Sequence, residues 1–168
     1  MEAIFKRRSI RKYTDDKVEQ EKIEKLLRAA MQAPSAGNQQ PWEFIVLQDK
    51  EKLVKLSQMS QYSKLIADAP LAFILLGNED RMRYPENWEQ DMGAATQNLL
   101  LEAVELNLGA VWMSAAPLND RMNYIKDMFN LEDKLKPYCV VTVGYAAKGQ
   151  ENKFIDRYDE SRVHYDNY

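Results

Sequence analysis

The sequence predicts a single α+β domain that covers residues 1–168. Apolar segments of strand length are separated by longer segments in which apolar residues recur every three or four positions, as they do in amphipathic helices. A chain of 168 residues with 45% hydrophobic residues has the size and composition of one globular domain with a sizeable core. The sequence contains no repeat, low-complexity segment or linker that would divide it.

The first elements are helical. A short helix is expected over residues 1–5, a turn over 14–17 and an amphipathic helix over 18–32. The longer helix has one apolar face, made by Ile23, Leu26, Leu27, Ala30 and Met31. A polar loop over residues 33–42 follows, because Pro34 and Gly37 prevent the helix from continuing.

Two strands are predicted next, over residues 44–47 and 71–76. The second is apolar without alternation, which indicates a strand covered on both faces, and it is expected to stop at Gly77. Between the strands, Asp49 is expected to cap a helix, and a second short helix is expected over 63–67.

A charged connection over residues 78–87 leads to the longest predicted helix, residues 88–107, with Gly109 closing it. Apolar and small residues occupy much of the circumference of this helix. A helix of this kind is buried on several sides, either in a core or against another subunit. A short strand over 109–113 is expected to follow.

The C-terminal part begins with Pro117, which is expected to open a helix. The apolar side of that helix carries Leu118, Met122, Ile125 and Phe129. Residues 138–145 predict the last core strand, and residues 148–168 a polar, extended tail dotted with aromatic residues.

Charge and composition exclude several classes of protein. A net charge of -3 and a pI near 5.3 give no overall field that favours nucleic acid or an anionic membrane. No apolar segment has transmembrane length, and the N-terminus lacks the apolar core of a signal peptide. Cys139 is the only cysteine, which suits a reducing compartment. We therefore expect a cytoplasmic protein without nucleic-acid or membrane partners.

Conventional catalytic side chains are also missing. His164, the only histidine, lies in the tail, so neither a histidine metal site nor a Ser-His-Asp arrangement is available. Cys139 lies within a predicted strand and is interpreted as a small core residue. Asp91 is interpreted as a carboxylate near a helix start that is either solvated or matched to the helix dipole. The glycine motifs of nucleotide-binding loops are absent. An enzyme of this sequence needs an organic cofactor to carry its reaction.

Two polar stretches are candidates for binding such a cofactor. Arg7, Arg8 and Arg11 surround Ser9 and offer charged donors that match phosphate oxygens; alternatively they form a solvated basic run. In the tail, Lys153 and Arg157 would complete an anion site if the tail folds back. The second stretch is the loop over residues 33–42, which is either a binding loop or an ordinary helix-to-strand connection. Its polar side chains are those of Ser35, Asn38, Gln39 and Gln40.

Taken in order, these motifs resemble the FMN-dependent nitroreductase family over nearly the whole chain. The resemblance rests on Arg-Arg-Ser-x-Arg at residues 7–11, on Ala-Pro-Ser-x-x-Asn-x-Gln-Pro-Trp at 33–42 and on Gly-Ala-Val-Trp-Met at 109–113. Val-Gly-Tyr at 143–145 and the tail from Arg157 complete it. It implies an α+β fold with a central, mainly antiparallel sheet flanked by helices. It also implies an intertwined homodimer, with the 88–107 helix at its core and FMN at the subunit interface.

The resemblance also implies roles for individual residues. Arg7, Ser9 and Arg157 would hold the phosphate and ribityl chain, and Arg8 would contribute to the same pocket, mainly near the ribityl or pyrimidine side. Arg11 would face N1 and O2 of the flavin ring. The partner subunit would supply Pro34, Ser35, Ala36, Asn38 and Gln40. The ring would lie beside Trp112, Met113, Ser114 and Ala115, with a backbone N–H of Ser114 or its neighbour near N5.

The implied activity is hydride transfer from NAD(P)H through flavin N5 to a small-molecule oxidant such as a nitroaromatic or a quinone. No side chain acts as a nucleophile or base; Arg11 stabilises the charge that reduction places on the ring. Reductive dehalogenation, flavin fragmentation and FMN storage or sensing without turnover remain alternatives. Ser114 stands where many members have glycine, and the 78–87 connection is short for a lid, so the acceptor is left open.

Overall fold

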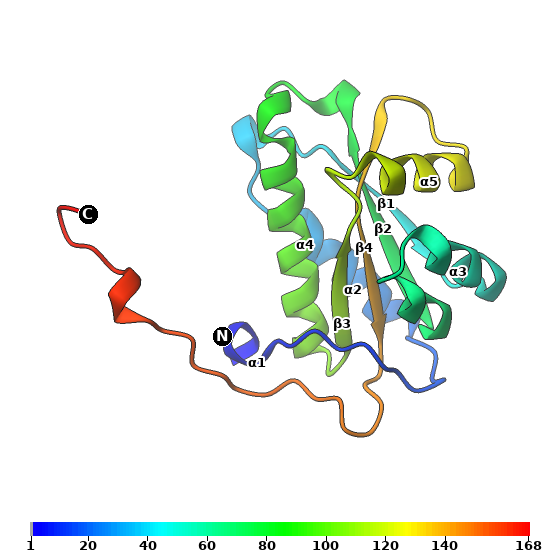
Figure 1. Ribbon diagram of the computed structural model, residues 1–168, viewed down its shortest axis with the longest axis horizontal. Coiled ribbons are helices and arrows are strands. Elements are labelled where there is room, and N and C mark those ends of the chain that lie inside the picture. Colours follow the sequence, from blue (N-terminus) through cyan, green and yellow to red (C-terminus); the bar gives the residue numbers. More distant parts are fainter. Residues whose placement is uncertain (1) are drawn as a thin grey trace.

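The computed structural model describes residues 2–168 and has three layers, with a sheet between two layers of helices (Figure 1). The expected helix start at Met1 lies outside the described residues. The helices are α1 (Glu2–Lys6), α2 (Gln20–Met31), α3 (Lys50–Leu56), α4 (Trp88–Glu105) and α5 (Asn119–Phe129). The strands are β1 (Trp42–Leu47), β2 (Leu71–Asn78), β3 (Gly109–Ser114) and β4 (Leu135–Gly144).

The sheet has the strand order β1-β2-β4-β3, and every neighbouring pair is antiparallel. The expected α+β class with a central antiparallel sheet is therefore confirmed. Helices α2 and α4 cover one face, while α3 and α5 cover the other. Side chains of β2 alternate between the two cores, with Phe73 on the α2–α4 side and Ile74 on the α3–α5 side. The prediction of a strand buried on both faces is thus also confirmed.

The segment after α1 runs along the exposed edge of β3. Ser9 pairs with Ala110 in a parallel bridge, and the Ile10 N–H donates to the Ala110 carbonyl at 3.0 Å. A Cβ on Gly109 would lie 2.5 Å from Ile10 Cγ2, so glycine is required for this close approach. The expectation that Gly109 closes the long helix was wrong. Asn107, in the left-handed region at φ 57, turns the chain after α4 instead.

Several other boundaries differ from those predicted. Helix α5 begins at Asn119 rather than Pro117, and α4 ends at Glu105 rather than two residues later. Strand β4 begins at Leu135 and includes Pro137, which pairs with β2 at an irregularity in the register. This proline is tolerated because β3 pairs with β4 only as far as Cys139, so the β3 side of Pro137 needs no backbone donor.

The cap and the tail agree with the predictions. The Asp49 carboxylate accepts a hydrogen bond from the Lys52 N–H at 2.9 Å at the start of α3. After residue 150 the chain extends away from the layers as a largely irregular tail with one short turn, Glu160–Arg162 (Figure 1). Among residues 2–168, no helix is both long enough and apolar enough to cross a membrane.

Candidate functional site

Arginines from both ends of the chain meet in one cavity of about 280 Å³, here called the basic cavity. Its lining residues are Ile4, Phe5, Arg7, Arg8, Ile155, Asp156, Arg157 and Tyr158. The tail reaches it where it passes α1: the Phe5 and Phe154 rings stack, with their centroids 5.8 Å apart. Lys153, the other tail cation of the sequence prediction, does not line this cavity.

The positive charges of the basic cavity are not neutralised by ion pairs. Within residues 2–168, no carboxylate forms an ion pair with Arg7, Arg8 or Arg157. Burial, followed by the like charges of Arg8 and Arg157, lowers the pKa of Arg7. Clustering these guanidinium groups without acidic partners costs free energy that a bound anion would recover.

Arg8 is fixed mainly by the backbone around it. Its guanidinium donates to the carbonyls of Phe5, at 2.9 Å, and of Arg7. Its Nε is buried and, within the described chain, has no hydrogen-bond partner.

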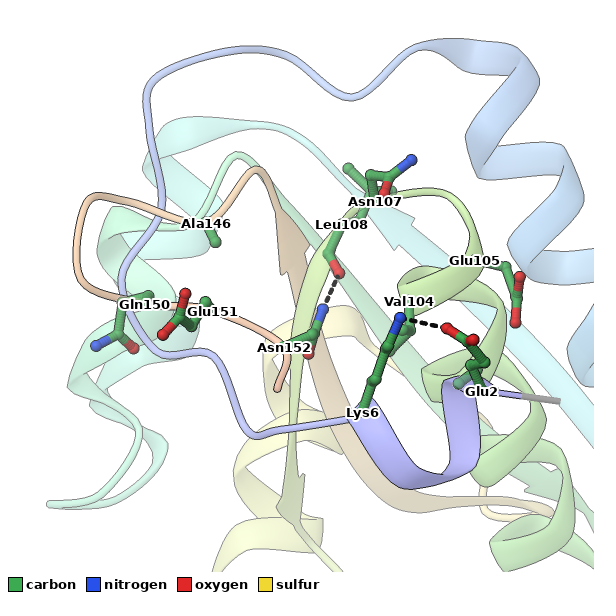
Figure 2. Close-up of a pocket in the computed structure, with 11 residues that line it drawn as sticks. Glu2, Lys6, Val104, Glu105, Asn107, Leu108, Ala146, Gln150, Glu151 and Asn152 are labelled. Atoms are coloured by element: carbon green, nitrogen blue, oxygen red, sulfur yellow. Dashed lines mark hydrogen bonds and ion pairs between the residues drawn. The ribbon is translucent and has the colours of Figure 1, made fainter. Parts of the chain in front are cut away.

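Two amide side chains of the tail hold the 7–11 segment in place. Asn152 Oδ1 accepts from the Arg8 N–H at 3.1 Å, and Gln150 Oε1 accepts from the Arg11 N–H at 3.2 Å. Asn152 Nδ2 also donates to the Leu108 carbonyl at 3.0 Å (Figure 2). The sequence prediction missed both residues; their only signal was a pair of amides at the start of the tail.

A separate cavity of about 490 Å³ lies along β3 and is here called the β3 cavity. It is lined by Arg11, Ser60, Tyr62, Leu65, Val111, Trp112, Met113, Ser114 and Arg121. The structure thus brings Arg11 together with Trp112, Met113 and Ser114. Ser9 lies between the two cavities, where its carbonyl accepts from Arg11 Nη1 at 3.2 Å. Ala115 does not line the β3 cavity: it is buried, and its N–H donates to the Tyr138 carbonyl at 2.9 Å.

The loop over residues 33–42 has a defined turn conformation that is held by internal hydrogen bonds. Gly37, Asn38 and Gln40 all adopt left-handed backbone conformations, with φ of 53°, 55° and 47°. The Ser35 hydroxyl accepts from the Gln40 N–H at 3.0 Å. Pro34, Asn38 and Gln40 are exposed, while Ser35 and Ala36 are half-buried, so these side chains form an accessible polar surface.

Asp91 anchors this loop; it lies in the first turn of α4 as expected, but the alternative of a solvated carboxylate was wrong. The side chain is only 5% exposed. Its two oxygens accept from the Ala36 N–H at 2.9 Å and from Gln39 Nε2 at 2.6 Å. Gln39 in turn bonds the backbone of Tyr84 through both ends of its amide. A carboxylate at this depth is retained because it satisfies buried donors of the loop.

The two halves of the predicted site lie at opposite ends of α4 within one chain. Asp91, in the first turn of α4, holds the loop, whereas α1 lies beside Val104 and Glu105 in the last turn (Figure 1). An 18-residue helix spans about 27 Å at a rise of 1.5 Å per residue. The structure therefore does not bring the loop residues to the basic cavity of the same chain.

The remaining chemistry in the described chain is sparse. Residues 2–168 contain no group of three or more histidine, cysteine, aspartate or glutamate side chains arranged to hold a metal ion. Cys139 is fully buried in β4, and burial raises the pKa of its thiol to about 12. The interpretation of Cys139 as a core residue is confirmed, since a thiol of this kind is unreactive near neutral pH.

Comparisons with known proteins agree with these features. The model of the nitroreductase family matches residues 4–63 and 57–145. A "putative NADH dehydrogenase/NAD(P)H nitroreductase" of Methanothermobacter thermautotrophicus is 41% identical over 98% of this chain and 85% of its own length. The structure of a "putative NADH oxidase" from Clostridium acetobutylicum superposes with a TM-score of 0.97, at 58% identity over 99% of both chains. An FMN-dependent nitroreductase of Clostridium difficile superposes with a TM-score of 0.89, at 34% identity over 100% of both chains. The chain therefore belongs to the nitroreductase family, as the order of its motifs predicts.

Proposed function

We propose that the chain is an FMN-dependent oxidoreductase that takes hydride from NAD(P)H and delivers it to nitroaromatic or quinone acceptors. Family membership and the names of its relatives, a nitroreductase that uses NAD(P)H and one that depends on FMN, support the flavin and the electron donor. The observation that carries the proposal is the cluster of Arg7, Arg8 and Arg157, one short segment away from the β3 cavity. Asp156 also lines the basic cavity, but no ion pair neutralises these arginines within residues 2–168. Such a pair of cavities suits a ligand with a phosphate at one end and a planar ring at the other.

The residues of the basic cavity fit the phosphate. Arg7 and Arg157 would bind its oxygens, Ser9 would bind the ribityl chain, and Arg8 would contribute to the same pocket on the ribityl or pyrimidine side. Each charge-assisted hydrogen bond of this kind contributes roughly 1.5–3 kcal/mol. The amides of Gln150 and Asn152 would keep the segment that carries these arginines in position.

The residues of the β3 cavity fit the ring. Bound FMN would supply a ring that accepts hydride at N5 and passes it on, so no side chain has to act as a nucleophile. Arg11 would place a permanent positive charge beside N1 and O2. The backbone N–H proposed near N5 is assigned to Ser114 rather than to its neighbour, because the Ala115 N–H already donates to Tyr138.

The site would be completed by a second copy of the chain. Pro34, Ser35, Ala36, Asn38 and Gln40 are too far along α4 to reach the basic cavity of their own subunit. In a homodimer, the same loop would contact the cofactor of the partner. The preformed left-handed turn supports this role, since it presents the polar groups without further ordering.

The proposed net reactions are two-electron reductions of the acceptor by NAD(P)H. A nitroarene, NAD(P)H and a proton would give a nitrosoarene, NAD(P)⁺ and water, and a quinone would give a hydroquinone. The protein's part is to position the ring and the acceptor and to exclude water. An FMN-storage protein would share the cavities and lack the turnover.

The test is to mix the FMN-loaded protein with NADH or NADPH in the absence of oxygen. We expect rapid bleaching of the flavin band, roughly at 450 nm. Adding 4-nitrobenzamide or a simple quinone should then restore the colour with consumption of the acceptor. Free FMN at the same concentration is the control for uncatalysed reduction. Bound flavin that stays yellow with both nucleotides would contradict the proposed enzyme and favour storage.

A further inference from the structure

The β3 cavity contains a second arginine that the proposed cofactor contacts leave free. Arg121 lies in the first turn of α5 and lines this cavity together with Arg11. Its Nη1 donates to the Ser114 carbonyl at 3.0 Å. Within residues 2–168, Arg121 forms no ion pair, and the lining of the cavity includes no acidic residue. A guanidinium carries five N–H donors, so this contact leaves most of its capacity for a ligand.

The other walls of the β3 cavity are flat or apolar. Tyr62, which is 69% exposed, lines the cavity, and Leu65 and Trp112 add apolar surface. An exposed aromatic ring beside a cation without an acidic partner is an arrangement that recognises planar, negatively charged molecules. At about 490 Å³, the cavity falls within the size range of small-molecule sites.

We propose that this site prefers planar aromatic acceptors with an anionic substituent, such as a carboxylate, and that Arg121 is the residue that determines this preference. The inference rests on the proposed function, in which Arg11 serves the cofactor and Arg121 remains for the acceptor. The hydrogen bond to Ser114 fixes the guanidinium beside the strand on which the ring would lie. The anionic group of the acceptor then pairs with Arg121, while its ring lies between Tyr62 and the cofactor ring that would cover Trp112.

The experiment compares two acceptors that differ in charge, 4-nitrobenzoate and 4-nitrobenzamide, in the parental protein and in Arg121→Gln. We expect the ratio of their kcat/KM values to shift towards the amide by about tenfold or more, the effect of losing one charge-assisted hydrogen bond. Arg121→Lys should retain most of the preference for the carboxylate. Arg28→Gln, on α2 across the sheet, is the matched control and should keep the parental ratio.

A role for Arg121 that is only structural, through the Ser114 carbonyl, would lower both kcat/KM values alike and leave the ratio unchanged. That result would overturn the proposal. A rise in KM for NADH or NADPH with an unchanged acceptor ratio would assign Arg121 to a phosphate of the donor and would overturn it as well.

A binding measurement separates this inference from the proposed function. Benzoate and benzamide cannot be reduced by the enzyme, and their dissociation constants follow from the perturbation of the flavin absorbance. We expect benzoate to bind more tightly than benzamide and to lose about tenfold in Arg121→Gln. Equal binding of the two by the parental protein would refute the inference even if both nitro compounds are turned over. Failure to reduce either nitro compound would contradict the proposed function instead.

Discussion

Arg7 and Arg11 are only four residues apart, yet they lie in different surroundings. Arg7 is half-buried in the basic cavity, and the neighbouring guanidinium groups of Arg8 and Arg157 contribute to its lowered pKa. Arg11 is exposed at the β3 cavity, beyond the bridge that joins Ser9 to Ala110. In the proposed function the same residue type would serve two purposes: Arg7 would face the fixed charge of the phosphate, and Arg11 a ring whose charge changes during the reaction.

We predict that Arg11→Gln lowers the midpoint potential of the bound flavin while most of the FMN is retained. At an effective dielectric constant of about 20, a unit charge about 4 Å away is worth on the order of 4 kcal/mol before screening and relaxation. A surviving effect of about 1–2 kcal/mol corresponds to a fall of roughly 20–45 mV for two electrons. Potentiometric titration, with flavin occupancy measured alongside, gives both quantities.

Arg7→Ala is the matched comparison, because it removes a guanidinium from the phosphate end. It should lower FMN affinity by about tenfold or more, as expected for the loss of one charge-assisted hydrogen bond. If Arg11→Gln instead lost its FMN and kept the parental potential in the remaining fraction, Arg11 would belong to the phosphate site. The division of roles between the two arginines would then be wrong.

At the scale of elements, the sequence predicts best where burial is continuous. The apolar run in β2 and the single apolar face of α2 identify these elements, because periodicity directly reflects which faces are covered. The ends were less predictable. Pro137 indicates a strand boundary in isolation, but the structure accommodates it where β3 has stopped pairing. The start of β4 at Leu135 is therefore decided by its pairing with β2, which the local sequence does not encode.

In the candidate site too, some residues could be predicted from local sequence and others depend on tertiary contacts. Its arginines and its Pro–Gly loop could be found because they are concentrated in short stretches of sequence. Asp91 could not, since the donors it serves are 52 and 55 residues away along the chain. A carboxylate in the first turn of a helix has an ordinary explanation in the helix dipole, and only the fold reveals that it is buried.

We predict that Asp91→Asn destabilises the protein by about 1–3 kcal/mol, although the two side chains are the same size. The asparagine amide would direct a donor at either the Ala36 N–H or Gln39 Nε2. Gln39 cannot relieve this by flipping its own amide, because its oxygen accepts from the Tyr84 N–H at 2.8 Å and its nitrogen donates to the Tyr84 carbonyl.

Urea unfolding measures this effect as a lower midpoint at an unchanged m-value. Glu89→Gln is the control: Glu89 is an exposed acid in the same helical turn, and its replacement should change the free energy of unfolding by less than about 0.5 kcal/mol. Equal stability of Asp91→Asn and the parental protein would show that the carboxylate is not needed to hold the loop.

At the scale of the whole molecule, α4 separates two sets of polar groups that each look incomplete. The basic cavity gathers cations, and the loop at the far end of α4 presents neutral polar groups that do not reach that cavity in the same subunit. The side of α4 near α1 also exposes apolar surface. Leu101 is half-buried there beside Ala3 and Ile4, in a shallow depression of about 270 Å³. A second copy of the chain would cover this surface and complete both sites.

We predict that Leu101→Glu converts a dimer into a monomer and lowers FMN occupancy with it, because each cofactor would lose the loop of the partner subunit. Leu100 is unsuitable for this test, since it is only 4% exposed within the single chain and a glutamate there would unfold the core. Val54→Glu is the control, because Val54 is 43% exposed on α3, across the sheet from α4, and should leave both properties unchanged. Light scattering at several protein concentrations, combined with the flavin-to-protein absorbance ratio, gives assembly and occupancy from one sample.

A parental protein that is monomeric and still binds FMN tightly would contradict the shared site. A Leu101→Glu monomer that keeps its full flavin content would place every necessary contact within one chain.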